Sequence, residues 1–325
     1  MHLLVSARFL KHFASKQIRQ HKLYKTTNIR MMSCLVSCQW LSEQMNKPDW
    51  HKELRVLDAT WDLPGAKRDC KQEHVDCRIP AARFFSLKDC SDKNSTLPHM
   101  LPSASEFEDF VSSLGVSNKH HVVVYDNSVK YGLFSAARAW WMFRIFGHNK
   151  VSVLDGGLPK WIKEGFKTVT GDVSGDEILP DPDQRFEAFF RPELVTDLSF
   201  MVENCQKSDS VQVMDARGND RFRGTADEPR AGAVSGHIPQ SKNVHFARLL
   251  DPDTKAMRQK EEIANIFSSS GIDLEKNVIA SCGSGVTACV LALGAFYSSG
   301  NEVTVYDGSW TDWSKNAPKQ LIEKD

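Results

Sequence analysis

The sequence predicts an α/β protein built from two tandem domains of one fold, each a parallel sheet with helices on both faces. Its 325 residues are enough for about two domains of ordinary size. Four segments of the first half recur in the second half, and short β-branched runs alternate with helical patterns in both halves. Since 41% of the residues are hydrophobic and 25% are charged, the chain has enough apolar side chains for two buried cores.

The internal repeat is the strongest of these observations, because the matching segments keep their order and an offset of roughly 155 residues. The four pairs are RVLDATW (55–61) with QVMDARG (212–218), CRIPAARFF (77–85) with GHIPQSKNVHF (236–246), HVVVYDNSVKYGLFSAARAWWMF (121–143) with NVIASCGSGVTACVLALGAF (277–296), and VSVLDGGLPKW (151–161) with VTVYDGSWTDW (303–313). Repeats of this length indicate two domains of one fold rather than a solenoid.

In each half, short apolar runs predict strands and apolar residues at helical spacing predict helices. The predicted strands are Arg55–Leu57, Val122–Tyr125, Val151–Leu154, Val211–Met214, Val278–Ala280 and Val303–Tyr306. The predicted helices are Ser37–Met45, Ser135–Phe146, Asp197–Cys205 and Val286–Tyr297. Strand–helix alternation with unbroken apolar strands is typical of a parallel sheet that is covered on both faces.

The boundary between the halves falls in TGDVSGDEILPDPDQ (170–184), whose Gly, Pro and Asp content is typical of a linker. The predicted division of the chain is a leader over 1–32, a first, non-catalytic domain over 33–169, a linker over 170–190 and a second, catalytic domain over 191–325.

The leader is basic, because the first 42 residues contain seven Lys or Arg and no Asp or Glu, although the whole chain has zero net charge. A basic tail can bind nucleic acid, and an acid-free amphipathic stretch can be a mitochondrial import signal. The import signal is favoured by four basic residues that fall near one helical face, namely Arg8, Lys11, Arg19 and Lys22. The alternative is a disordered extension before a second start at Met31 or Met32, which would add a cytoplasmic form.

Cysteine content and hydropathy argue against several classes of protein. Eight cysteines in 325 residues are too few for a disulfide scaffold, so we expect free thiols in a reducing compartment. No pair of them forms C-x-x-C, and we expect no metal site. No run of about 18 apolar residues is present, so we expect no transmembrane helix and no membrane as partner. We also expect no nucleic acid as partner.

Five of the predicted strands end in or beside an aspartate, and one ends beside a cysteine. The aspartates are Asp58, Asp126, Asp155, Asp215 and Asp307. Taken one by one, they are turn or helix-capping residues. In open α/β sheets, however, ligands bind at the carboxyl ends of the strands. That rule puts Cys282 at the site of the second domain, and Asp126 holds the equivalent place in the first.

The loop that follows Cys282 has almost no side chains. Its glycines allow successive backbone N–H groups to point at one anion, and the helix expected after it adds a positive N-terminal end. Both effects favour a reactive thiolate at Cys282. The backbone groups concerned are those of Gly283, Ser284, Gly285, Val286 and Thr287.

Two other interpretations of the loop are less consistent with the sequence. A buried structural cysteine needs no glycine loop, and we assign that role to Cys289, inside the predicted helix. A cysteine phosphatase needs an arginine six residues after the nucleophile, and Ala288 stands there.

The loop CGSGVTAC, the segments FRGTADEPR and GHIP, and the paired halves resemble the two-domain rhodanese family over residues 33–318. Gly283 and Ser284 are uncharged, as in the branch that acts on 3-mercaptopyruvate, whereas the thiosulfate branch has basic residues there. The resemblance implies a ping-pong reaction in which Cys282 takes sulfur from 3-mercaptopyruvate, releases pyruvate, and passes the sulfur to thioredoxin, a small thiol or cyanide. It implies no cofactor, and a monomer or a redox-dependent dimer.

Two alternatives to this function stay open. One is a thiosulfate sulfurtransferase, and the other is a sulfur-carrier or protein-binding module with little turnover. The intact cysteine loop speaks against an inert module, because Asp126 shows what a loop without the nucleophile looks like in the same chain.

The resemblance also implies roles for residues around the sulfur. Arg221 and Arg230 are implied as the clamp for the substrate carboxylate, which arginine binds through a two-pronged fork, and Arg223 is a third candidate in the same segment. Ser284 and His99 are implied as catalytic residues, although His99 taken alone is an exposed loop histidine.

An acid is expected next to the histidine, and here the sequence departs from the family. Lys88 occupies the family's acid position, and the neighbouring Asp89 is the possible substitute. We interpret His237 as structural and Phe134 either as a wall of the pocket or as core packing.

Overall fold

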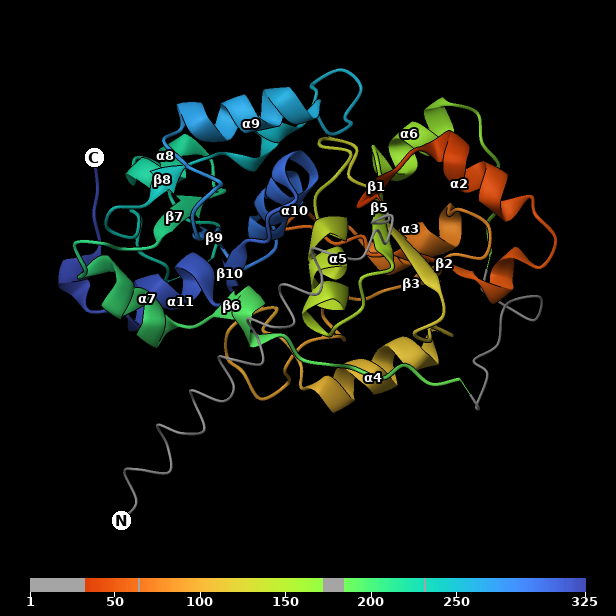
Figure 1. Ribbon diagram of the computed structural model, residues 1–325, viewed down its shortest axis with the longest axis horizontal. Helices are drawn as coiled ribbons and strands as arrows, with labels where there is room; N and C mark the ends of the chain where they lie inside the picture. Colours follow the sequence, from red (N-terminus) through yellow and green to blue (C-terminus); the bar gives the residue numbers. More distant parts are fainter. Residues whose placement is uncertain (1–32, 64, 172–183, 231) are drawn as a thin grey trace, which may run out of the picture. The chain divides into compact units, whose positions relative to one another are not determined.

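The computed structural model describes residues 33–63, 65–171, 184–230 and 232–325 (Figure 1). The predicted leader, with Met31 and Met32, and most of the predicted linker lie outside the described residues. Among the helices that are described, none is long and apolar enough to cross a membrane.

Each half of the chain forms one five-stranded parallel sheet. The first sheet contains β1 (Leu35–Val36), β2 (Leu54–Asp58), β3 (Arg83–Phe84), β4 (His121–Tyr125) and β5 (Val151–Leu154). The second contains β6 (Val195–Thr196), β7 (Gln212–Asp215), β8 (Lys242–Asn243), β9 (Val278–Ser281) and β10 (Thr304–Tyr306). The strand orders are β1-β5-β4-β2-β3 and β6-β10-β9-β7-β8. These orders are the same when strands are counted within each half, so the prediction of two domains of one parallel α/β fold is confirmed.

Helices connect the strands in both halves. Those of the first half are α2 (Cys38–Met45), α3 (Cys70–Asp76), α4 (Ala104–Ser113), α5 (Ala136–Ile145) and α6 (Gly157–Lys163). Those of the second half are α7 (Leu198–Cys205), α8 (Asn219–Arg223), α9 (Lys260–Ser269), α10 (Ala288–Ser299) and α11 (Ser309–Asn316). Short 3₁₀ turns are η1 (Trp50–Lys52), η2 (Pro192–Leu194), η3 (Phe246–Leu249) and η4 (Lys319–Leu321). Ser37, Ser103 and Asp197 cap α2, α4 and α7 by accepting from a backbone N–H three residues on.

Both faces of each sheet are covered, since alternate residues of a strand face opposite sides. In β4, Val122 packs with residues of α4 and α5, and Val123 packs with residues of α2 and α6. In β9, Ala280 packs with residues of α9 and α10, and Ile279 packs with residues of α7 and α11. The strands are therefore apolar on both sides, which explains their unbroken apolar runs.

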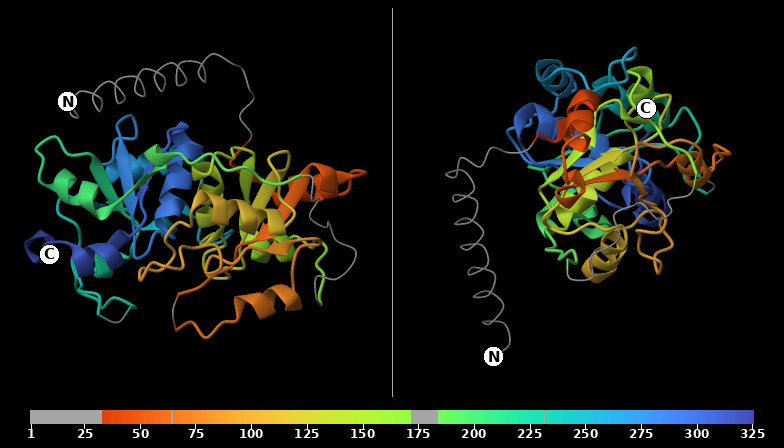
Figure 2. Two further views of the ribbon diagram at one scale, coloured as in Figure 1. Left: turned by 90° about the horizontal axis from the view of Figure 1, so that it is seen from below. Right: turned by 90° about the vertical axis from the view of Figure 1, so that its right-hand side faces the viewer.

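The helices α5 and α10 pack against each other between the two sheets (Figures 1 and 2). Every residue of α5 is buried, and so are residues 288–295 of α10. One hydrophobic cluster includes side chains of both helices and extends into both sheets. Side chains of the first domain can therefore reach the loop that precedes α10.

Candidate active site

Cys282 follows β9 directly and is 2% exposed. Its backbone N–H donates to Ser309 Oγ at 3.2 Å, and its carbonyl accepts from the N–H of Trp310 at 2.9 Å. Ser309 Oγ in turn donates to the carbonyl of Tyr306 at 2.8 Å. The YDGSW segment at the end of β10 thus holds the cysteine in place.

Three carbonyl groups of the loop point outward to partners elsewhere in the protein. The carbonyl of Cys282 accepts from Trp310, that of Gly283 from the Thr311 N–H at 3.0 Å, and that of Gly285 from Arg138 Nη1 at 3.2 Å. Because a trans peptide is planar, the N–H of the following residue points the opposite way from each carbonyl. The N–H groups that follow these three carbonyls are therefore turned away from the partners.

These inward N–H groups have no protein acceptor. Within the described part of the chain, no backbone N–H of residues 283–287 makes a hydrogen bond. Buried backbone donors are rarely left in this state. The loop after Cys282 is therefore a set of donors without an acceptor, as a site for a transient anion requires.

The equivalent loop of the first domain contains its own anion. Asp126 follows β4 and is 1% exposed. Its carboxylate accepts from the N–H groups of Phe134 at 2.8 Å, Ala136 at 2.7 Å and Ser128 at 3.1 Å. Burial raises the pKa of Asp126 to about 6, and these backbone donors act against that rise. A fixed carboxylate fills the first loop, whereas the second loop begins with a cysteine at the equivalent position.

Gly285 is required by the geometry of the second loop. Its φ of +77° lies in the left-handed region, which favours glycine. A Cβ atom there would lie 2.7 Å from the backbone oxygen of Asp307 and 3.0 Å from Arg138 Nη1. Neither the backbone conformation nor the space admits a side chain.

Two arginines converge on Gly283, the residue next to the cysteine. A Cβ atom on Gly283 would lie 3.0 Å from Arg221 Nη2 and 3.8 Å from Arg230 Nη1. Burial lowers the pKa of Arg230, Arg221 lowers it further, and Cys282 acts in the opposite direction. Nη2 of Arg230 is buried and has no hydrogen-bond partner in the described chain. Arg223, by contrast, is exposed and lies 3.8 Å from Asp325.

Glu228 holds Arg221 in this position. Its carboxylate accepts from Arg221 Nη2 at 2.6 Å and from Arg217 Nη1 at 2.7 Å. Arg217 is 2% exposed and also donates to Asp215 at the end of β7. The role of Asp215 is thus to anchor a buried ion network behind the clamp, which the sequence did not reveal.

His99 comes from the first domain, in the loop before α4, and has a positive φ of 63°. Its ring lies 4.7 Å from that of Trp61, between ring centroids. Burial, helped by Arg138 and Arg230, lowers the pKa of His99 to about 3. Its Nδ1 is buried without a hydrogen-bond partner in the described chain. His99 is therefore a neutral imidazole close to the clamp rather than an exposed loop residue.

The predicted acid does not join His99. Lys88 and Asp89 are both exposed, and the Asp89 backbone N–H bonds to Ser86 Oγ at 3.1 Å. Ser284 is 4% exposed, and its side chain makes no hydrogen bond within the described residues. The structure brings Cys282, the two arginines and His99 into one region, but it does not assemble a Ser–His–Asp relay.

Two further residues have the surroundings that their structural interpretations require. Nδ1 of His237 lies 3.0 Å from the carbonyl oxygen of Phe222, and the two rings stack at 4.1 Å. Phe134 is 5% exposed and stacks on Trp61 at 5.9 Å. Because Trp61 also contacts His99, Phe134 is both core packing and a supporting wall of the site.

Six of the other cysteines have surroundings that favour the protonated thiol. Burial raises the pKa values of Cys34, Cys38, Cys70, Cys90, Cys205 and Cys289. Protonated thiols are poor nucleophiles. For Cys289 the raised pKa is about 12, and its Sγ lies 3.2 Å from the Gly285 carbonyl oxygen. Among the described residues, no group of three or more His, Cys, Asp or Glu side chains could hold a metal ion.

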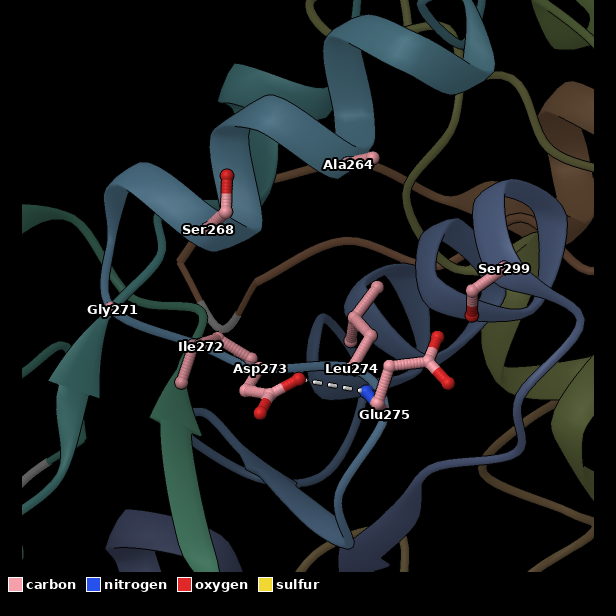
Figure 3. A pocket seen from close by; sticks show the side chains of 8 residues that line it. All are labelled: Ala264, Ser268, Gly271, Ile272, Asp273, Leu274, Glu275 and Ser299. Atoms are coloured by element: carbon pink, nitrogen blue, oxygen red, sulfur yellow. Dashed lines mark hydrogen bonds between the residues drawn. The ribbon is translucent and has the colours of Figure 1, made fainter.

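A surface hollow of about 370 Å³ lies elsewhere, beside α9 and the end of α10 (Figure 3). Its lining residues are Ala264, Ser268, Gly271, Ile272, Asp273, Leu274, Glu275 and Ser299. None of them belongs to the Cys282 loop or to the arginine clamp. The hollow is a gap between surface elements, and we assign no reaction to it.

Comparison with known proteins agrees with this geometry. The chain matches the rhodanese-like domain family twice, over residues 37–164 and 201–316. It is 41% identical over 296 residues to the 3-mercaptopyruvate sulfurtransferase of Mus musculus, covering 91% of this chain and 97% of the relative. It is 41% identical over 317 residues to the mitochondrial thiosulfate/3-mercaptopyruvate sulfurtransferase 1 of Arabidopsis thaliana, covering 93% and 81%.

Among solved structures, SseA from Escherichia coli, described as a 3-mercaptopyruvate sulfotransferase with the rhodanese fold, is similar over 86% of this chain and 99% of its own. The TM-score is 0.72 and the sequence identity 35%. The chain therefore belongs to the family of rhodanese-like sulfurtransferases and has one rhodanese-like domain in each half.

Proposed function

We propose that this protein is a 3-mercaptopyruvate sulfurtransferase in which Cys282 carries the transferred sulfur. The observation that supports it best is the pair of guanidinium groups beside Gly283. A Cβ atom added to Gly283 would lie 3.0 Å from Arg221 Nη2 and 3.8 Å from Arg230 Nη1. A 2-oxo acid has a carboxylate that these groups can bind as a fork. The buried, unpartnered Nη2 of Arg230 gains its missing acceptor when a carboxylate binds.

The reaction follows from the nucleophile and the loop. The Cys282 thiolate attacks the sulfur of 3-mercaptopyruvate, and the carbon–sulfur bond breaks with its electron pair going to carbon. The resulting pyruvate enolate takes up one proton and leaves as pyruvate. The Cys282 persulfide that remains is an anion for the free N–H groups of residues 283–287.

The second half of the reaction returns the enzyme to its starting state. An acceptor thiolate attacks the outer sulfur of the persulfide, the sulfur–sulfur bond to Cys282 breaks, and the Cys282 thiolate leaves. Small thiols, thioredoxin and cyanide are the proposed acceptors. Because no acid partners His99 in the described chain, we assign His99 to binding in its neutral form and leave Asp89 out of the relay.

The experiment is a comparison of donors with the purified protein. We expect pyruvate release from 3-mercaptopyruvate with a thiol acceptor, and a mass increase of one sulfur atom on Cys282 when the acceptor is omitted. Cys282→Ser should abolish both signals, and Cys289→Ser should keep both. Pyruvate release by Cys282→Ser at the wild-type rate would refute the mechanism.

A thiosulfate sulfurtransferase is the second candidate, since the Arabidopsis relative carries both activities in its name. The loop disfavours it, because Gly283 and Ser284 are uncharged, whereas the thiosulfate branch of the family is expected to have basic residues at these two positions. A higher kcat/KM for thiosulfate than for 3-mercaptopyruvate would reverse this order of preference.

We also propose that the protein enters mitochondria through residues 1–32. The support is the acid-free basic composition of that leader and the mitochondrial relative from Arabidopsis. A fusion of residues 1–32 to a fluorescent protein should accumulate in mitochondria, and a diffuse signal would remove the claim. Initiation at Met31 or Met32 would add a cytoplasmic form.

A further inference from the structure

Arg138 links the two domains at the active site without being part of the substrate clamp. It lies on α5 of the first domain, and its side chain is 1% exposed. Its Nη1 lies 2.7 Å from Asp307 Oδ1 and donates to the Gly285 carbonyl at 3.2 Å. Its Nη2 donates to the carbonyl of His99. One guanidinium group therefore contacts three segments of the site.

The contact with Gly285 fixes part of the loop that follows Cys282. The Gly285 carbonyl also accepts from Cys289 Sγ at 3.2 Å, so two donors hold its direction. Since the peptide between Gly285 and Val286 is planar, a fixed carbonyl also fixes the Val286 N–H on the opposite side. A cation beside the carbonyl further polarises this peptide, which strengthens its N–H as a donor.

The contact with His99 fixes the loop that the first domain contributes to the site. His99 has a left-handed backbone, which is unfavourable for a residue with a side chain and persists only where neighbours impose it. Arg138 holds the carbonyl of His99, and Asp307 Oδ2 accepts from the N–H of Leu101 at 2.8 Å. The Arg138–Asp307 pair therefore holds the backbone on the C-terminal side of His99, from the His99 carbonyl to the Leu101 N–H.

We propose that Arg138 is a positioning residue for sulfur transfer, which sets the Cys282 loop and His99 relative to each other across the domain boundary. This inference rests on the proposed function. It requires the planar guanidinium, because Nη1 serves Asp307 and Gly285 while Nη2 serves His99, and an ammonium group offers only one nitrogen in one place. A purely structural ion pair would require only opposite charges.

The test separates positioning from stability with a paired substitution. Arg138→Met removes the three contacts and leaves Asp307 as a buried, unpaired carboxylate, which is strongly destabilising. Adding Asp307→Asn removes that charge and keeps an oxygen for Leu101. In the double variant we expect most of the lost stability to return, while single-turnover persulfide formation stays about 100-fold below wild type.

Arg144 is the matched control. It lies on the same helix, is buried, and crosses the same boundary to pair with Glu302 and to stack over Phe296 at 4.1 Å. It touches neither the loop nor His99. Arg144→Met should lower stability but leave persulfide formation within about threefold of wild type, and Arg138→Lys should lower kcat more than it changes KM.

The outcomes distinguish a positioning role of Arg138 from a purely stabilising one. Recovery of both stability and rate in the double variant would reduce Arg138 to an ion pair, and an equal rate loss in Arg144→Met would show a general effect of the domain boundary. If Arg138→Met alone does not fold, the double variant and Arg138→Lys still give the rate. A wild-type protein that forms no persulfide from any donor would instead refute the proposed function itself.

Discussion

Replacing Arg230 by methionine should lower kcat/KM, while the free energy of unfolding stays equal or rises. Nη1 of Arg230 would lie 3.8 Å from a Cβ atom on Gly283, and its Nη2 is buried without a partner in the described chain. A buried donor without an acceptor destabilises the free enzyme, whereas the same donor stabilises a bound carboxylate. Methionine fills a similar volume without bringing a charge or a donor.

The magnitudes follow from these contacts. A hydrogen bond to a charged group contributes about 1.5–3 kcal/mol, so losing one such bond to the substrate carboxylate lowers kcat/KM by about 10–160-fold. Removing the unpaired donor relieves a desolvation cost of about 1–3 kcal/mol. We therefore expect the free energy of unfolding of Arg230→Met to equal or exceed that of the wild type.

Pyruvate release gives the activity and urea denaturation gives the free energy of unfolding. Arg223→Met is the control from the same segment, since Arg223 is exposed and makes only a 3.8 Å contact with Asp325. It should change neither quantity. The reasoning fails if Arg230→Met keeps kcat/KM within about threefold of wild type, or if it loses stability as a structural arginine would.

Two further predictions concern the loop and the histidine. Gly285→Ala should lower the free energy of unfolding, measured in denaturant, by at least about 1–2 kcal/mol. The reasons are the positive φ of Gly285 and the 2.7 Å between the added Cβ atom and the backbone oxygen of Asp307. A change below about 0.5 kcal/mol would contradict this. The pKa of about 3 for His99 lies below its usual value of about 6.5, so the unfolded chain binds a proton that the folded chain does not. Stability from this site is thus present above about pH 6.5 and is lost as the pH falls toward 3; His99→Gln should flatten that loss in acid titrations, and its kcat/KM profile between pH 5 and 8 should keep the wild-type shape.

Long, buried strands were predictable from the sequence, and short edge strands were not. β2, β4, β5, β7, β9 and β10 all lie close to their predicted bounds. The strands β1, β3, β6 and β8 have two residues each, too few for any hydrophobic period to appear. Their place is set by pairing with the longer strands.

Helices were found where their apolar pattern was strong. The predicted α2, α5, α7 and α10 are all present. Six of the described helices were not predicted, namely α3, α4, α6, α8, α9 and α11. For α4 the sequence does display a signal, because Ser103 and Glu106 form a capping box of the pattern S-x-x-E. Searching for that signature would have found it without any structural information.

The active site also has parts that were predictable from the sequence and parts that were not. The Cys282 loop was visible because its glycines report a backbone requirement, and the structure shows that requirement directly at Gly285. The role of Arg138 was not visible, because its partners Gly285 and Asp307 are about 150 and 170 residues away in sequence and meet it only through packing of α5 on α10. The signal that the sequence offered was a pair of arginines, Arg138 and Arg144, in an otherwise apolar helical segment.

The two loops meet the same demand in different ways, and this difference can be measured. In the first domain, the N–H groups of Ser128, Phe134 and Ala136 donate permanently to Asp126. In the second domain, the N–H groups of residues 283–287 have no acceptor in the described chain. A persulfide anion on Cys282 supplies one, so loading with sulfur should protect these amides and leave those of the first loop unchanged.

Amide hydrogen exchange with and without the donor tests this directly. One charge-assisted bond of about 1.5–3 kcal/mol slows exchange of its amide by about 10–100-fold. We expect slowing of that size within residues 283–287, none at Phe134 or Ala136, and none anywhere in Cys282→Ser treated with the same donor. Equal exchange of the second loop in the thiol and persulfide forms would mean that its free N–H groups do not bind the sulfur anion, and the absence of side chains there would then need another cause.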